Sequence, residues 1–399
     1  MTDCKELCDL GLEQLLFREY DKALDYFIEA YKLDRSSPEI WYNIGQCYFG
    51  KNGFEAAAEH YKEATKLRMD YSEAWAMLAT CYYNMLEVNQ AISCYKMAAD
   101  MAKTDSFKSD CLNDMSAVYL AMGRFDIGYK YFKHRRINDT WDGTQSLVGK
   151  HLYVVGDGGL GDQIFFSRYL PWISDFNYKE LVVRVQPEVY KWFKSEFIQN
   201  GTKAYITCEK PSMFDYVVSM SSLPKIFNTQ LGTIPIVHQN IPELYNIRNI
   251  GLAWSGNPLH ANDSKRSMPV TQINKIIDAF PNKNFYRLQK NVPYADKDLV
   301  HTRLITVNYE TVDEMAKQMA DIEIDLVITV DTMTAHLACT EGYNTFIMLP
   351  YAPDWRWGLT GDTTPWYPTA RLFRQDIEKS WDTVINNVID EVRNASNSR

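Results

Sequence analysis

The feature that most constrains this fold is a set of aromatic and small residues recurring every 34 residues in the first third of the chain. One complete copy consists of Trp41, Gly45, Tyr48, Phe54, Ala57, Tyr61 and Ala64, and the next of Trp75, Ala79, Tyr82, Val88, Ala91, Tyr95 and Ala98. An earlier copy keeps Gly11, Tyr20, Ala23, Phe27 and Ala30, and a degenerate one, 37 residues further on, keeps Tyr119, Phe125, Gly128 and Phe132. Small residues let paired helices approach and aromatic residues fill the wedge between them, so the pattern predicts stacked helical hairpins.

The spacing and residue types of this repeat resemble the tetratricopeptide repeat. Residues 1–137 are therefore expected to form a solenoid of about four repeats with a concave face. Such a surface suits a peptide, a protein acceptor or a second copy of the chain, although the repeated aromatic positions themselves are typical of the core between helices. A basic cluster, Lys130, Lys133, His134, Arg135 and Arg136, ends the last helix, where cations complement the helix dipole.

After a predicted linker at residues 138–150, short β-branched runs alternate with amphipathic helices, which is typical of parallel α/β sheets. The predicted strands are Leu152–Val155, Leu181–Arg184, Ala204–Thr207, Tyr216–Ser219, Asn249–Trp254, Asn284–Leu288, Leu304–Val307, Asp325–Val330 and Thr345–Leu349. The predicted helices are Asp162–Ser174, Pro187–Phe197, Val270–Ala279, Val312–Ala320, Thr334–Gly342 and Trp381–Asn394. We expect two facing Rossmann-like domains, residues 151–246 and 247–399, with ligands bound beyond the carboxyl ends of their strands.

A glycine-rich loop, GDGGLGDQ at residues 156–163, follows the first predicted strand. Its glycines allow a ligand to approach the backbone, and the following helix offers free N–H groups to an anion. Asp162 opens that helix and points into the expected cleft, although an aspartate there is also a good N-cap. The spacing lacks the dinucleotide fingerprint, which disfavours a nicotinamide dehydrogenase.

A strongly polar loop, residues 254–269, follows the fifth predicted strand. It combines small, amide and cationic side chains, namely Ser255, Gly256, Asn257, His260, Asn262, Lys265, Arg266 and Ser267. Such a set can neutralise and hydrogen-bond a diphosphate, whereas the alternative is a solvated polar loop.

A third loop joins the strand that ends near Asp331 to the next helix. Thr332, Met333 and Thr334 begin this helix, whose N–H groups can hold a phosphate. His336 lies inside the helix and is either part of the ligand site or a buried structural histidine.

With these loops in view, the second part of the chain resembles the heptosyltransferase-like glycosyltransferases of family 9, which have the two-domain GT-B fold. The whole chain is similar to bacterial or phage proteins that fuse tetratricopeptide repeats to such a domain. The resemblance rests on residues 141–171, on GLAWSGNP with the H, ND, RS and P that follow it at residues 251–269, on VITVDTMTAHLA at 327–338, and on LPYAPDWRW with PWYPTARLFRQ at 349–375.

The resemblance implies an inverting, metal-independent transfer of a sugar from a nucleotide-diphosphate sugar to an acceptor, with no further cofactor. It implies a catalytic base at Asp162 and an acceptor side at Asp157, Gly159, Gly161 and Gln163. It implies donor and phosphate contacts from Ser255, Gly256, Asn257, Lys265, Arg266, Asp331, Thr332, Met333 and His336. A nucleoside site at Gln289 and Lys290 is the weaker implication. The family pattern has EQGLGD where this chain reads DGGLGD, which affects the acceptor side at Asp157, and a small residue where this chain has Met333.

Composition narrows the class of protein further. The net charge is −9, with no basic half, which disfavours tight binding to nucleic acid. No apolar run reaches the roughly 18 residues of a membrane span, and the N-terminal residues lack the apolar core of a signal peptide. The eight cysteines form no CxxC pair, which favours buried, reduced thiols in a cytoplasmic protein. No group of residues has metal-ligand spacing, and Asp296 and Asp298 are expected to be surface charges.

Three functions remain open from the sequence. The preferred one is a glycosyltransferase whose repeats present a protein acceptor or partner. The second is a non-catalytic scaffold that binds sugar nucleotides or glycans. The third is a viral DNA-base glycosyltransferase, against which the acidic composition counts.

Overall fold

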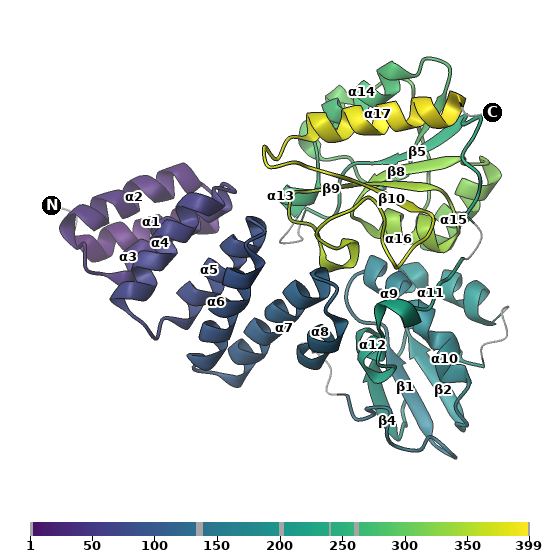
Figure 1. The fold of residues 1–399 in the computed structure, drawn as a ribbon, viewed down its shortest axis with the longest axis horizontal. Helices are drawn as coiled ribbons and strands as arrows, with labels where there is room; N and C mark the ends of the chain where they lie inside the picture. Colours follow the sequence, from purple (N-terminus) through teal and green to yellow (C-terminus); the bar gives the residue numbers. More distant parts are fainter. Residues whose placement is uncertain (1–2, 133–138, 199–202, 239–240, 259–262, 398–399) are drawn as a thin grey trace. The chain divides into compact units, whose positions relative to one another are not determined.

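The computed structural model describes residues 3–132, 139–198, 203–238, 241–258 and 263–397. It divides the chain into two compact units, residues 1–135 and 136–399 (Figure 1). The first is wholly helical in its described part, and the second is built on two parallel sheets. The predicted order of a helical solenoid and then a parallel-sheet α/β region is confirmed. Most of the basic cluster, residues 133–136, lies outside the described residues.

Between residues 3 and 132, the first unit consists of four consecutive helical hairpins. Its helices are α1 (Cys4–Leu16), α2 (Tyr20–Leu33), α3 (Pro38–Gly50), α4 (Phe54–Leu67), α5 (Ser72–Asn84), α6 (Val88–Asp100), α7 (Asp105–Ala121) and α8 (Phe125–Tyr131). Each helix packs against the next along the chain, so the hydrophobic core continues from hairpin to hairpin. Pro38 occupies the first turn of α3, where a missing N–H costs nothing.

Hydrogen bonds repeat with the same 34-residue spacing as the sequence. Tyr61 donates to the Gln46 side chain within the second hairpin, and Tyr95 and Thr80 make the corresponding contact within the third. The Trp41 indole donates to the Arg35 carbonyl, and the Trp75 indole donates to the Met69 carbonyl in the same way. The repeat is therefore structural, because equivalent side chains make equivalent contacts.

Glycine at the eighth repeat position permits a close contact between helices. A Cβ atom on Gly45 would lie 2.7 Å from the ring of Tyr61, which is fully buried. Gly11 stands in the same relation to Phe27. These two positions explain why small residues recur there.

The second unit begins with a four-stranded parallel sheet in the order β3-β2-β1-β4. Its elements are β1 (His151–Val155), α9 (Leu160–Phe166), α10 (Leu170–Ser174), β2 (Glu180–Arg184), α11 (Pro187–Phe193), β3 (Tyr205–Thr207), β4 (Tyr216–Ser219) and α12 (Leu223–Ile226). In register, Leu152 of β1 lies between Leu181 of β2 and Tyr216 of β4. The order reverses between β1 and β4, which makes the carboxyl ends of these strands a topological switch point.

A six-stranded parallel sheet follows in the order β10-β9-β8-β5-β6-β7. Its strands are β5 (Asn249–Ala253), β6 (Asn284–Arg287), β7 (Leu304–Thr306), β8 (Leu326–Val330), β9 (Thr345–Leu349) and β10 (Ala370–Arg374). Its helices are α13 (Asp263–Arg266), α14 (Val270–Ala279), α15 (Val312–Asp321), α16 (Met333–Thr340) and α17 (Trp381–Asn397). This is the strand order of the doubly wound nucleotide-binding fold, and its switch point lies between β5 and β8.

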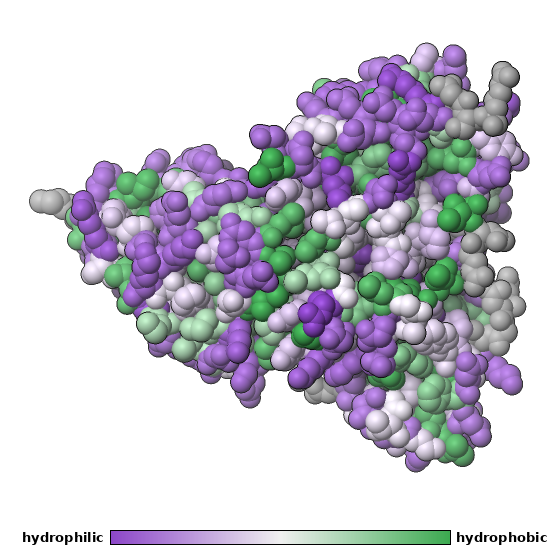
Figure 2. Space-filling model, in the orientation of Figure 1, coloured by the Kyte–Doolittle hydropathy of each residue, from purple (hydrophilic) through white to green (hydrophobic). Residues whose placement is uncertain are grey.

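Helices cover both faces of the second sheet. Helices α14 and α17 lie on one face, and α15 and α16 lie on the other (Figure 1). Apolar side chains of α14 and α17, such as Ile277 and Val388, form one core with sheet residues such as Ile250 and Ile328. The outward faces of α14 and α17 are hydrophilic (Figure 2), as expected for helices that bury a single apolar stripe.

The structure differs from the expectations at several points, including a break of the predicted helix Asp162–Ser174 into α9, a 3-10 turn and α10. The edge strand β10 was missed, because it is short and Arg371 and Arg374 interrupt its apolar pattern. Asp162 is the third residue of α9, whose N-cap is Gly159. The prediction that Asp296 is a surface charge is wrong. Its buried carboxylate accepts hydrogen bonds from the Trp254 indole, at 3.0 Å, and from the Val270 amide at the start of α14.

All eight cysteines lie in described parts of the chain and are free thiols, five of them buried. None of the described helices has both the length and the apolar character needed to cross a membrane.

Candidate functional site

The candidate site lies at the carboxyl ends of β1, β5 and β8. The three loops singled out in the sequence follow these strands. Strand β1 borders the switch point of the first sheet, and β5 and β8 border the switch point of the second. All three loops therefore occupy the positions where doubly wound sheets bind ligands.

The glycine-rich loop holds Asp162 by its backbone. The Gly159 amide donates to Asp162 Oδ2 at 2.8 Å, which closes the first turn of α9. Gly158 has a φ of +76°, and a Cβ atom there would lie 2.5 Å from the same carboxylate oxygen. Glycine at position 158 is therefore required both for the left-handed turn and for the position of Asp162.

Two residues predicted for the acceptor side, Asp157 and Gln163, make hydrogen bonds to segments that follow neighbouring strands of the first sheet. Both carboxylate oxygens of Asp157 accept from Ser221, one from its amide and one from its hydroxyl. The buried Gln163 accepts from the Gln186 amide through Oε1. These contacts tie the loop after β1 to the segments after β4 and β2, so both side chains hold the loop in shape.

Helices α9 and α16 pack against each other near their N-termini. A Cβ atom on Gly161 would lie 3.0 Å from His336 Cδ2 and 3.3 Å from Met333 Cα. Gly161 thus permits this contact, and the contact brings Asp162 of the first sheet's loop to the Asp331–Thr332 loop of the second.

The polar loop after β5 places Arg266 beside Asp331. The Gly256 amide donates to Ser267 Oγ, and this hydroxyl donates to the Asp263 carboxylate at 2.9 Å. Arg266 pairs with Asp263 through Nε and donates from Nη1 to the Asp331 carbonyl at 2.9 Å. A guanidinium is therefore fixed next to the N-terminal end of α16, where the dipole of the helix also attracts an anion.

Gln289 fixes the first residues of the same loop. Its Oε1 accepts from the amides of Trp254 and Ser255, and its Nε2 donates to Ser255 Oγ and to the Asn291 carbonyl. Because these bonds use both donors and the amide oxygen, the Gln289 side chain positions the loop. Asn257 is exposed and Lys265 partly exposed.

Lys290 lies in a hollow of about 550 Å³ beyond the carboxyl end of β6. Arg287 and Lys297 also line the hollow, so three cations face it, and the exposed Glu310 pairs with Lys290. The hollow is next along the sheet edge from the loop after β5, since β6 neighbours β5.

The charges around α16 shift two titrating groups. Burial, together with the smaller effect of the nearby Asp354 carboxylate, raises the pKa of Asp331 to about 6, and Arg266 opposes the rise. Burial also holds the pKa of His336 well below its ordinary value, and the nearby arginines add to this effect. His336 is thus a neutral imidazole, which contacts the Tyr367 hydroxyl at 3.0 Å and stacks on Trp357.

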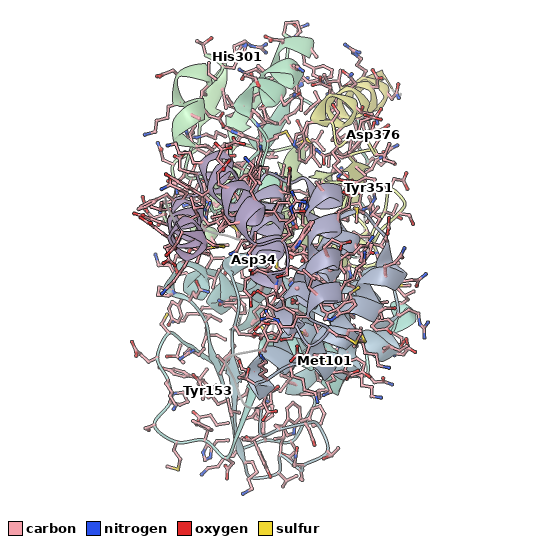
Figure 3. The ribbon with its side chains drawn as sticks, turned by 90° about the vertical axis from the view of Figure 1, so that its left-hand side faces the viewer. Asp34, Met101, Tyr153, His301, Tyr351 and Asp376 are labelled. Atoms are coloured by element: carbon pink, nitrogen blue, oxygen red, sulfur yellow. The ribbon has the colours of Figure 1, made fainter. Side chains whose placement is uncertain are left out.

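Two arginines were missed in the sequence, the buried Arg168 and the largely buried Arg356. Arg168 donates to the carbonyls of Phe165 and Trp366. Arg356 lies in the connection between β9 and β10, within PDWRW, and pairs with both Asp162 and Asp354. The residues that follow β9 and β10, Tyr351 and Asp376, lie on one side of the unit (Figure 3). PDWRW entered the sequence analysis only as part of the family resemblance, and its arginine between aromatic residues was the available signal.

The structure therefore brings together Asp162, Gly161, Arg266, Asp331, Met333 and His336, with the N-cap Thr332 alongside. It adds Arg356 to them and leaves Lys290 in the neighbouring hollow. His260 and Asn262 lie outside the described residues. Within the described ranges, no group of three or more histidine, cysteine, aspartate or glutamate side chains is placed to hold a metal ion.

Comparison with known proteins gives a family match in the first unit. The family model of the tetratricopeptide repeat matches residues 38–70. Among curated proteins, protein FlbA of Caulobacter vibrioides is 24% identical over 327 residues, which is 70% of this chain and 54% of that protein. The chain thus spans about half the length of the curated relative it matches.

Two solved structures are similar to about a third of the chain or less. MamA is 24% identical, with a TM-score of 0.31, over 33% of this chain and 75% of its own. The Sgt2 TPR domain from Aspergillus fumigatus is 23% identical, with a TM-score of 0.27, over 28% of this chain and 76% of its own. The family match shows a tetratricopeptide repeat at residues 38–70, and the helical unit as a whole resembles a tetratricopeptide-repeat solenoid that precedes a parallel-sheet α/β region.

Proposed function

We propose that the α/β unit is a glycosyltransferase of the GT-B type, which transfers a sugar from a nucleotide-diphosphate sugar to an acceptor with inversion. The observation that carries the proposal is that Asp162, the N-terminus of α16, Arg266 and Arg356 lie close together. This places a proton acceptor next to a site that suits a diphosphate.

The donor side of the proposal rests on charge. A leaving diphosphate gains negative charge as the bond to the sugar breaks, and fixed cations and helix dipoles stabilise that charge. Arg266 donates a hydrogen bond to the Asp331 carbonyl. The first backbone N–H groups of α16 have no hydrogen-bond partners within the helix. The cationic hollow at Lys290 extends this edge of the sheet toward β7 and is where we place the nucleoside end of the donor.

The acceptor side rests on Asp162, whose side chain is 36% exposed. In the proposed reaction Asp162 takes the proton of the acceptor hydroxyl, and the hydroxyl oxygen of the acceptor forms a bond to the anomeric carbon of the sugar. The carbon–oxygen bond to the diphosphate breaks on the opposite face, and the electron pair leaves with the diphosphate. A single displacement of this kind inverts the anomeric centre. The charge of the leaving group is met by arginines and the helix dipole, so the proposed reaction needs no divalent ion.

The helical unit offers a surface on which a protein partner can bind. Tetratricopeptide repeats stack into extended surfaces, and a hollow of about 420 Å³ opens among α6, α7 and α8. Lys96, Lys108 and Lys130 line it together with apolar residues such as Leu112 and Met115. We propose that this unit holds a protein acceptor or partner, with a peptide segment as the simplest occupant.

A second candidate is a non-catalytic scaffold that binds sugar nucleotides. One observation favours it: both oxygens of Asp162 already accept hydrogen bonds, from Gly159 and from Arg356. A scaffold would bind the donor and release no diphosphate.

The experiment is an assay of nucleoside diphosphate released from UDP-, GDP-, ADP- and CDP-linked sugars, with and without excess EDTA. We expect release from one of them by the full chain, unaffected by EDTA. Asp162→Asn should keep donor binding and lower turnover by about 10²–10⁴. Asp298→Asn, at an exposed site on the same unit, is the matched control. Binding without release favours the scaffold, and neither binding nor release refutes the assignment.

A further inference from the structure

Arg356 is the side chain through which the loop after β9 reaches the loop after β1. It lies in a short 3-10 turn, Trp355–Trp357, and only 11% of the side chain is exposed. Nη2 donates to Asp162 Oδ1, and Nη1 donates to Asp354 Oδ1 at 2.8 Å. Its Nε is buried and has no hydrogen-bond partner among the described residues.

The surroundings keep this guanidinium charged and hold its plane. Burial lowers the pKa of Arg356, but the carboxylates of Asp354 and Asp162 more than compensate and raise it above the ordinary value. The rings of Trp355 and Phe165 lie 4.7 and 4.8 Å from its central carbon. A planar cation between aromatic faces can rotate between hydrogen-bond partners while it keeps its packing.

Arg356 also reaches the donor side of the candidate site. The Asp331 carboxylate, which precedes α16, is among the charges that act on Arg356, and Arg356 acts on it in return. The guanidinium therefore lies within electrostatic range of Asp162 and of the N-terminal end of α16, where the diphosphate is proposed to bind.

The contact to Asp162 occupies the oxygen that an acceptor needs. Asp162 Oδ2 is held by the Gly159 amide, and Oδ1 is held by Arg356. An acceptor hydroxyl that approaches Asp162 therefore competes with the guanidinium. A diphosphate, by contrast, offers several charged oxygens in the geometry that arginine binds through two parallel hydrogen bonds.

We propose that Arg356 is a positioning residue that couples donor binding to the catalytic base: it holds Asp162 in the unliganded protein and turns to the diphosphate when the sugar nucleotide binds. This inference rests on the proposed function, because it takes the diphosphate to bind at α16. The exchange frees Asp162 Oδ1 for the acceptor hydroxyl, so the donor binds first. The unpartnered Nε is one further donor available to phosphate oxygens after the rotation.

The coupling between the Arg356–Asp162 contact and donor binding predicts the direction of a change in donor affinity. In the unliganded protein Arg356 must give up a charged partner before it binds the diphosphate, so the contact to Asp162 weakens donor binding. Removing the charge of Asp162 should therefore tighten it. Couplings between sites are commonly about 5–150-fold in affinity, which sets the expected scale. A role confined to folding predicts no tightening.

The experiment measures by calorimetry the binding of UDP, GDP, ADP and CDP to the full chain and to four variants. We expect the diphosphate that the wild type binds to bind Asp162→Asn at least about 5-fold more tightly and Arg356→Lys more weakly. In the double variant, Asp162→Asn should no longer tighten binding, since the lysine lacks the fork that exchanges partners. Arg393→Gln, on the exposed face of α17, is the control for loss of an arginine.

The outcomes separate this inference from the proposed function. If the wild type binds a diphosphate and Asp162→Asn binds it no more tightly, the coupling is wrong and the proposed function stands. The same holds if Arg356→Lys binds like the wild type. If no diphosphate binds the wild type at about 1 mM, the proposed function fails and the coupling fails with it. Thermal midpoints of all variants verify folding, and Asp162→Ala repeats the test should Asp162→Asn fold poorly.

Discussion

Replacing Asp331 with asparagine should stabilise the α/β unit near neutral pH. Burial and the nearby Asp354 carboxylate raise the pKa of Asp331 from 3.8 to about 6 in the folded protein. Between these values the folded state binds a proton that the unfolded state has released, so stability falls as the pH rises through this window. Above pH 6 the folded protein carries a charge that its surroundings disfavour.

The magnitude follows from the size of the shift. A difference of about two pKa units corresponds to roughly 3 kcal/mol, and partial access of solvent to Asp331 reduces this to an expected gain of about 1–3 kcal/mol. Asparagine has the same shape and no charge, so the gain should be present near pH 7.5 and should fade as the pH falls toward 4. At low pH the wild-type carboxyl is itself neutral.

The assay is thermal or urea unfolding of wild type, Asp331→Asn and Asp298→Asn across that pH range. Asp298 is exposed on the same unit and serves as the matched control. Equal stability of wild type and Asp331→Asn near pH 7.5 would refute the reasoning. So would a difference that grows as the pH falls. Higher stability of Asp331→Asn near pH 7.5 is the result expected if Asp331 is retained for function at a cost in stability.

The remaining predictions concern the donor site and the solenoid. Arg266→Gln should weaken binding of a nucleoside diphosphate by about 1.5–3 kcal/mol and affect the bare nucleoside less, as calorimetry can measure; equal losses for both ligands would contradict contact with phosphate. Gly45→Leu should lower the free energy of unfolding of the helical unit by about 1–3 kcal/mol in thermal unfolding, because the leucine side chain would overlap the buried Tyr61 ring. As the control, Gly53→Ala meets no contact closer than 3.4 Å and should have little effect. Deleting residues 1–135 should leave donor binding intact and abolish transfer to a protein acceptor, and loss of donor binding by a folded truncation would show that the two units are not separable as assumed.

Much of the fold could be predicted because periodicity carries it. The 34-residue repeat and the alternation of β-branched runs with amphipathic helices each reflect burial within a short stretch of chain. Strand β10 was missed for the same reason, since Arg371 and Arg374 interrupt its apolar pattern. Arg374 is held by the carbonyls of Trp357, Gly358, Thr360 and Gly361, a contact that no local pattern reveals.

The candidate site could be predicted in its loops but not in its contacts. Asp162, Arg266 and Asp331 were each identified because each follows a predicted strand. The roles of Asp157, Gln163 and Gln289 in holding loops depend on partners 23 to 64 residues away. Arg356 lies 194 residues from Asp162, and only the fold brings the two together.

The most direct test of the central claim is hydrogen exchange of the full chain with and without a nucleoside diphosphate that it binds. The account places the diphosphate at the N-terminus of α16, beside the loop after β5. The amides of residues 332–335 and 255–258 should therefore exchange more slowly with ligand, and those of α1 to α6 should be unchanged. Protection confined to the solenoid, or none in these two segments despite saturating ligand, would contradict the account.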